Sequence, residues 1–417
     1  MFFNKSKRAP VVDARIDPKD INSCSYWKRE HYIPIRKADL IDRLATELSG
    51  DDRERFLELC KLLDATLSLE FNAILGKLKR AYASANPDAD TRNLDPPSDD
   101  IKSDCVDELF SHFESVLKRA NFQKLSVEQV KDAIGTASDF GVRLKLDLNA
   151  FDRLDVYARG DIVHHRSRDG KANSKASDRI DVPIYQRLVA IFQPNEELPI
   201  HGCEPSDMVY LKLMKNVPHE DVDMMLPGGQ VQMSMLDGGK VLLPTVSGLF
   251  IAITKILKGA VILAFAKLYQ VLALVLFVVG TLSYGWKSFS GYKRIKATYE
   301  HNVTKSMYFR SLDNNAGVLH RLIDEAHEQE LRETVLGYFV LWRAASEYEW
   351  TANQIDRKAE EKLRAMTKID IDFEVEDAIA KLERFGLVQR NVNGTWRAER
   401  IHRAISAVDT RLHALLP

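Results

Sequence analysis

Cysteine is scarce in this 417-residue chain, and the cysteines that are present stand far apart. They are Cys24, Cys60, Cys105 and Cys203, and none of them belongs to a CxxC pair. This spacing gives no sign of a zinc ribbon or of a disulfide framework, so the thiols fit a reducing compartment. The N-terminal MFFNKSKRAP lacks the apolar run of a secretory signal, and the acidic residues that follow argue against a mitochondrial presequence.

Short catalytic motifs are also missing. The sequence contains no GxSxG nucleophile elbow, no GxGxxG or GxxxxGK[ST] phosphate loop and no HExxH zinc motif. A net charge of −1 gives no general reason to expect nucleic acid as a partner. We therefore predict no catalytic residue and no cofactor, and we favour a protein that is not an enzyme.

One group of residues has spacing that could bind a metal ion. His320, Asp324 and His327 recur at i, i+4 and i+7, which places them on one face of a helix. Position 331, where a zinc helix beginning at His327 would need a second histidine, is Leu331. We interpret the three residues as a polar helical face, and they remain the sequence's candidates for a metal site.

A long apolar stretch, Val241 to Trp286, dominates the hydropathy of the chain. Its second half, from Leu268 onward, carries no formal charge. A helix needs roughly 20 apolar residues to cross about 30 Å of hydrocarbon. The first half contains Lys255 and Lys258, which share a helical face and are costly near mid-bilayer. We predict a transmembrane hairpin over 241–286; a single span after an interfacial helix stays open as an alternative.

A basic collar follows this stretch, and we define it as Lys287, Lys293, Arg294 and Lys296. Bases close to a membrane span mark its cytoplasmic side and attract anionic lipid headgroups. The sequence thus predicts an integral protein of a bacterial inner membrane, with its other domains in the cytoplasm. A mitochondrial inner membrane is the alternative.

Elsewhere, apolar stripes at helical spacing predict long helices, of which Asp51–Tyr82 is the clearest. Alternation in Val142–Leu148 and several short strand-like runs predict an antiparallel sheet. The predicted fold class is mainly α with a small antiparallel β domain (α+β), a transmembrane helical hairpin and a C-terminal winged-helix-like domain. The predicted segments are a flexible leader at 1–30, an N-terminal helical region at 31–137 with a linker at 85–100, a β-rich domain at 138–240 with a mobile loop at 167–181, the transmembrane hairpin at 241–286, a helical region at 287–347 and the winged-helix-like domain at 348–417.

The winged-helix prediction depends on the order helix, helix, hairpin. A capping box, Thr351 to Gln354, opens the first helix, and Asn393-Gly394 predicts a two-residue type I′ turn in the hairpin. The second helix of this segment, near residues 375–385, is rich in acids. Phosphates would repel such a helix, so we predict a protein-contact or packing role and do not favour a nucleic-acid partner.

Several stretches resemble the transmembrane protein 143 family, a domain of unknown function. They are YLKLMKNVP at 210–218, DVDMMLP at 221–227, YFRSLDNNAGVL at 308–319, AHEQE at 326–330, DAIAKLERFGL at 377–387 and HYIPIR at 31–36. The resemblance extends over roughly residues 31–415 and implies a two-span membrane protein. It implies no activity and no catalytic residues.

Three hypotheses about function follow. The preferred one is a membrane-anchored scaffold or adaptor that contacts the lipid bilayer and one or more protein partners, with homo-oligomers allowed. The second is an oligomeric pore or transport-related protein in which Lys255 and Lys258 line a polar path. The third is a hydrolase at the membrane surface that uses His320, Asp324 and His327.

Overall fold

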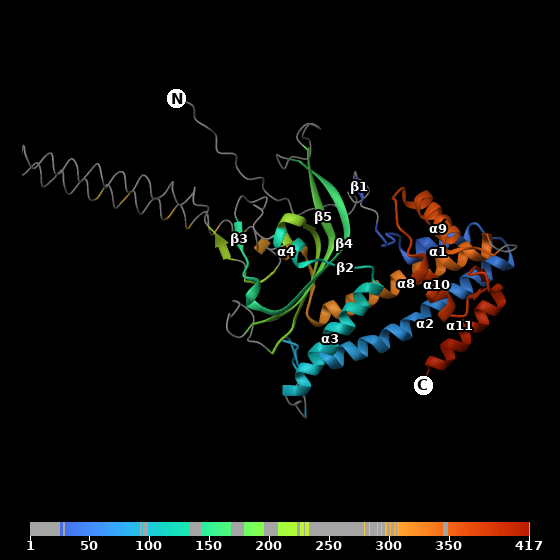
Figure 1. The fold of residues 1–417 in the computed structure, drawn as a ribbon, viewed down its shortest axis with the longest axis horizontal. Coiled ribbons are helices and arrows are strands. Elements are labelled where there is room, and N and C mark those ends of the chain that lie inside the picture. Colours follow the sequence, from blue (N-terminus) through green and yellow to red (C-terminus); the bar gives the residue numbers. More distant parts are fainter. Residues whose placement is uncertain are drawn as a thin grey trace, which may run out of the picture.

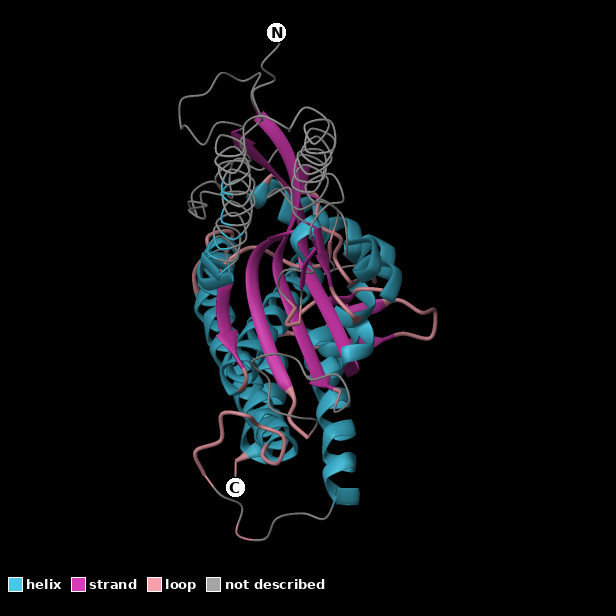
Figure 2. Ribbon diagram, turned by 90° about the vertical axis from the view of Figure 1, so that its left-hand side faces the viewer, coloured by secondary structure: helices cyan, strands magenta, loops and turns pink. Residues whose placement is uncertain are grey.

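The chain folds into an antiparallel sheet with long helices against one face and a group of short helices at one end (Figures 1 and 2). This computed structural model describes residues 26–27, 30–91, 94, 99–133, 143–167, 179–195, 207–222, 226–228, 230–232, 307–344 and 349–416, and isolated positions between 279 and 305. It contains a mixed α/β arrangement in which helices and sheet share one core.

The long helices form a layer against the sheet. They are α2 (Asp51–Tyr82), α3 (Asp99–Arg119) and α8 (Ala316–Ala344). The short α1 (Lys37–Ala45) packs against α2 and α8, and the short α4 (Val127–Ala133) lies apart from them. The bounds of α2 are those that its apolar stripe predicts. Gly50 precedes it with a positive φ of 58°, which separates it from α1.

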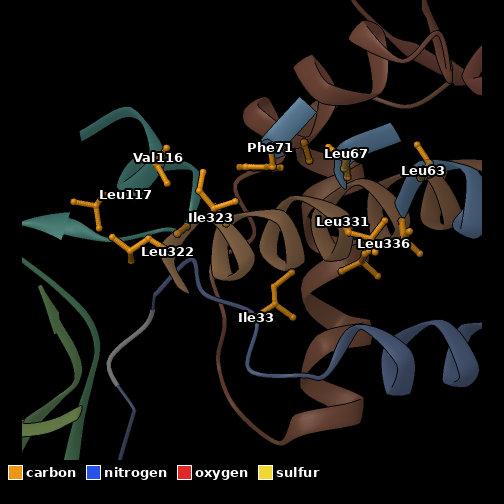
Figure 3. Packing of buried hydrophobic residues seen from close by; sticks show 14 of the residues in the cluster. Ile33, Leu63, Leu67, Phe71, Val116, Leu117, Leu322, Ile323, Leu331 and Leu336 are labelled. Atoms are coloured by element: carbon orange, nitrogen blue, oxygen red, sulfur yellow. The ribbon is translucent and has the colours of Figure 1, made fainter. Parts of the chain in front are cut away.

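The core of this layer lies where α2, α3 and α8 meet. Figure 3 shows Leu67 and Phe71 of α2 near Leu331 of α8, while Val116 of α3 lies near Ile323. All five side chains are buried. This interface is the largest apolar cluster among the described residues, and it also receives Ile33 from the N-terminal side of α1.

The main sheet has the order β1-β4-β5-β6-β8, with β2 paired to the same strand as β1, and all its pairs are antiparallel. Its strands are β1 (Tyr26–Trp27), β2 (Gln123–Lys124), β4 (Phe151–Ser167), β5 (Arg179–Pro194), β6 (Tyr210–Pro218) and β8 (Ser311–Asn314). Both faces are covered, since Val189 and Ile191 belong to the helix-side core and Leu188 and Ala190 to a second core on the other face. The continuous apolar run Leu188–Phe192 is typical of such a two-sided strand.

The sheet is larger than the small β domain that the sequence predicts. Strands β4 and β5 stay in register from Arg153–Gln193 up to Ser167–Arg179, after an irregularity next to Phe151. Residues 167 and 179–181, at the ends of the predicted mobile loop, therefore belong to strands, and 168–178 lie outside the described residues. The strand predicted at 142–148 is only β3 (Arg143–Lys145), which pairs with β7 (Gln230–Gln232), and η2 (Leu148–Ala150) follows it. A second 3-10 turn, η4 (His219–Asp221), ends β6.

The tail contains α9 (Ala352–Thr367), α10 (Val375–Arg384), β9 (Val388–Arg390), β10 (Trp396–Ala398) and α11 (Ile401–Leu415). The predicted capping box of Thr351 and Gln354 is confirmed. The predicted type I′ turn is wrong, because Arg390 pairs with Trp396 and leaves a five-residue loop. The Asn391 carbonyl accepts a bond from the Gly394 N–H, and Gly394 alone in this loop has a positive φ, 73°.

The membrane part of the predicted fold and the predicted localisation need correction. Within the ranges given above, no helix has both the length and the apolar character needed to cross a bilayer. The predicted transmembrane hairpin and the predicted integral-membrane localisation are therefore not supported. Lys255, Lys258, Lys287, Arg294 and Lys296 lie outside the described residues, as does most of 241–286; Lys293 is described and is helical and exposed.

Candidate functional site along the central helix

Helix α8 carries a group of polar and charged side chains that are buried. Between Gln329 and Leu341 every residue of this helix is buried, and polar side chains occupy its middle. These are Gln329, Glu330, Arg332, Glu333 and Thr334, each at most 4% exposed. A buried charge is tolerated only when an opposite charge or several hydrogen bonds compensate for lost hydration. The partners of these residues therefore define the site.

Glu333 meets Lys381 of α10. The two form an ion pair whose side chains are 2% and 7% exposed. Burial alone would lower the pKa of Lys381, but Glu333, then Glu330 and Asp377, outweigh that effect and raise it. The other oxygen of Glu333 accepts bonds from Asn121 Nδ2 at 2.9 Å and Gln329 Nε2 at 2.7 Å.

Glu330 continues this arrangement toward α3 and α2. Its carboxylate accepts two bonds from Arg119, the second at 2.9 Å, and lies 3.3 Å from Arg384. Arg384 reaches Glu70 at 3.4 Å, and Glu70 also binds Arg411 at 2.8 Å. We call the series Arg119–Glu330–Arg384–Glu70–Arg411 the charge ladder. Because its members come from α3, α8, α10, α2 and α11, it fastens the tail to the helical layer.

Burial would raise the pKa of Glu330, but the bonds from Arg119 and the charges of Lys381 and Arg384 hold it below its usual value. The carboxylate is therefore ionised at neutral pH and cannot act as a proton donor there. The ladder is therefore an electrostatic clamp between helices.

An irregular segment, residues 30–36, crosses α8 above this site, and we call it the strap. The His31 carbonyl accepts bonds from Asn121 at 3.0 Å and from Gln329 at 3.4 Å. Arg332 donates to the Ile35 carbonyl at 2.8 Å, and Ile33 is fully buried. The buried polar groups of α8 thus serve the backbone of the strap.

The strap also joins the sheet to the tail. The carboxylate of Glu30 accepts the backbone N–H groups of Gly160 at 2.7 Å and Asp161 at 2.5 Å. The Glu30 backbone pairs with Ile371, and the His31 ring lies 3.3 Å from the carboxylate of Glu374. Burial, chiefly, raises the pKa of Glu374, and the charge of His31 opposes this shift.

The predicted metal candidates do not come together. His320 and Asp324 are exposed on α8, whereas His327 points to Asp64 of α2 at 2.9 Å and its ring lies against Phe71. The bond from His327 is the main cause of a lowered pKa at Asp64, with Lys37 contributing. No group of three metal-binding side chains is found in the described part of the chain.

A groove of about 430 Å³ lies between the first turns of α2 and α11. Its lining includes carboxylates of Asp51, Glu54 and Glu58 beside Arg55 and His402. Asp51 is already paired with Arg55 at 2.7 Å, and His402 also contacts Arg55. The groove is therefore lined largely by charged side chains, some of which are paired with one another.

Glu330, Glu333 and Lys381 were not predicted as a site from the sequence. This part of α8 looks like an apolar stripe, and the bases of α10 look like surface charges. A usable signal was present in VLGYFVLW at 335–342, since a helix that is apolar on every side is surrounded by other elements. Charges one turn before such a run must then be partly buried and paired.

Comparison with known proteins finds a similarity to a family whose function is unknown. No solved structure matches the chain. The resemblance to the transmembrane protein 143 family is not tested by these comparisons, so it stays a prediction. A family described as "Protein of unknown function (DUF3754)" matches residues 184–317, which include β6, β8 and most of β5, and over that range the chain is similar to this family.

Proposed function

We propose that this protein is a non-catalytic scaffold that holds protein partners on a rigid frame of helices and sheet. The observation that carries this proposal is the charge ladder, because it uses ionised side chains from five helices to fix their positions. Charges that bind one another in a buried interface are unavailable for turnover but set a single geometry. A fixed geometry is what a scaffold supplies to its partners.

The tail helix α10 supports a protein partner over nucleic acid. Lys381 and Arg384, its two bases, are held by Glu333, Glu330 and Glu70. The buried side of α10 includes Ala378, Ile379 and Leu382. A winged-helix protein that reads DNA needs this helix free to enter the major groove. Here it lies against α8.

The proposal is tested by crosslinking and affinity purification of the full chain. We expect a protein partner in fixed stoichiometry with wild type, and a weaker yield with Arg384→Met, which breaks the ladder at its middle. Lys358→Met is the matched control, because Lys358 makes only an exposed pair with Glu361. The proposal fails if no stoichiometric partner appears. It also fails if purified protein hydrolyses model esters and His327→Ala abolishes that turnover.

A further inference from the structure

A cluster of arginines lies where the sheet meets the first half of α8, separate from the charge ladder. Glu325 of α8 is its centre. The carboxylate of Glu325 lies 2.7 Å from Arg159 of β4, 3.6 Å from Arg187 of β5 and 3.4 Å from Arg321, one turn earlier on α8. Three guanidinium groups therefore share one carboxylate.

The strand register explains why these cations are together. Arg159 and Arg187 are directly opposite each other on neighbouring strands, and Lys215 of β6 is directly opposite Arg187. Like charges at opposite positions destabilise a sheet unless an anion lies between them. Glu325 provides one anion, and Asp313, 3.3 Å from Arg321, provides another. The three arginines carry three positive charges and the two carboxylates carry two negative ones. One positive charge therefore remains unbalanced, even before Lys215 is counted.

Arg187 is the member with spare hydrogen-bonding capacity. A guanidinium carries five N–H donors. In the described structure, Nη1 of Arg187 donates to the carbonyl of its neighbour Gln186 at 3.0 Å. Its buried Nε faces Glu325 at 3.6 Å, which is too long for a hydrogen bond, so Glu325 compensates this guanidinium incompletely. Burial, together with the charges of Arg159 and Arg321, outweighs Glu325 and lowers the pKa of Arg187. An additional anion would relieve that repulsion.

The cluster is also accessible from one side. Arg159 is deep, with 4% of its side chain exposed and the Tyr32 ring stacked 4.0 Å from its guanidinium. Arg187 and Arg321 are 28% and 40% exposed, so their outer edges face solvent. A guanidinium group that reaches solvent binds phosphate through charge-assisted hydrogen bonds.

We propose that Arg187 and Arg321, supported by Arg159 and oriented by Glu325, bind a small phosphate-bearing anion at this junction of sheet and α8. The ligand class is inorganic phosphate or a soluble phosphate monoester. Glu325 keeps the forks in place, while the unbalanced positive charge supplies the attraction. This binding site is independent of the scaffold proposal.

The test is titration calorimetry of the full chain with inorganic phosphate and with glycerol 3-phosphate, at ionic strength held constant with chloride. We expect saturable binding of at least one of the two. Arg187→Gln should weaken it by about tenfold or more, because it removes charge-assisted bonds. Arg343→Gln, at an exposed arginine in the last turn of α8, should bind as wild type does.

Arg187→Lys provides a second variant in case Arg187→Gln does not fold. It keeps the charge but loses the fork, so we expect affinity between that of wild type and that of the glutamine variant. Stronger binding of glycerol 3-phosphate than of phosphate would identify the monoester as the preferred ligand. The proposal is overturned if neither compound gives saturable binding, or if Arg187→Gln and Arg343→Gln bind equally well.

Discussion

Lys381 of α10 and Glu333 of α8 form an ion pair that is almost sealed from solvent. Removing one partner of such a pair leaves an uncompensated charge in the interior. We therefore expect Lys381→Met to lower the free energy of unfolding by about 3–5 kcal/mol. Urea denaturation followed by circular dichroism measures this change.

The double variant Lys381→Met with Glu333→Leu distinguishes a lost charge partner from lost packing. Replacing both charges by apolar groups of similar size should recover part of the stability. The recovery is incomplete because the amides of Asn121 and Gln329 lose the acceptor that Glu333 provides. Lys358→Met, in an exposed pair, should change it by less than about 1 kcal/mol. If the double variant is no more stable than Lys381→Met, the pair is not the source of the effect.

The pKa of Glu330 gives a prediction for acid. A carboxyl whose pKa is lower in the folded protein than in the unfolded chain, where it is about 4.3, contributes stability above the unfolded value. That contribution is lost as the pH falls through the folded pKa. We expect Glu330→Gln to lower the free energy of unfolding at neutral pH. Below about pH 4.5, the variant should lose less of its stability with falling pH than wild type does. Parallel pH curves for the two proteins would contradict this assignment.

Gly160 is required by two constraints at once. Its φ is 77°, and a Cβ at this position would lie 2.6 Å from the side chain of Gln186. Gly160→Ala should therefore cost about 2–4 kcal/mol from backbone strain and overpacking. Gly76→Ala is the control, because nothing lies within 4 Å of its Cβ in α2 and its expected effect is about 1 kcal/mol of stabilisation. Thermal unfolding of both variants checks the contrast.

At Gly394, in the loop of the tail hairpin, a substitution tests backbone strain in the absence of steric crowding. Its φ is 73°, and nothing lies within 4 Å of the position that a Cβ would take, so only the backbone resists a side chain. Gly394→Val should cost about 1–3 kcal/mol, and Gly394→Asn much less, because asparagine tolerates the left-handed region. Equal melting temperatures for the two variants would mean that the loop adjusts without strain.

Local patterns predicted local structure well. The stripe of α2 and the capping box at Thr351 were readable because the interacting residues are a few positions apart. Strand β8 was not readable. Its sequence, Ser-Leu-Asp-Asn, favours a turn, and it becomes a strand through pairing with β6, about a hundred residues earlier. Asn315 then ends it with a φ of 48° and accepts the Leu211 N–H through its side chain.

The site was harder still to predict. Glu333 and Lys381 look like surface charges when each helix is considered alone, and only the contact of α8 with α10 makes them a buried pair. The strap posed the same problem. HYIPIR at 31–36 stood out only as part of a family resemblance, whereas its contacts are with side chains almost three hundred residues away.

The strap also has a consequence for the order in which the protein can be assembled. Residues 30 and 31 are made about 340 residues before their partners Ile371 and Glu374. At 5–20 residues per second, the gap between them is roughly 20–70 s of synthesis. Near the end of that interval α8 has been made, but its Glu330 and Glu333 lack Arg384 and Lys381 until α10 follows about 40 residues later. The nascent chain therefore has a period in which a chaperone could recognise it, and that period ends when the tail arrives.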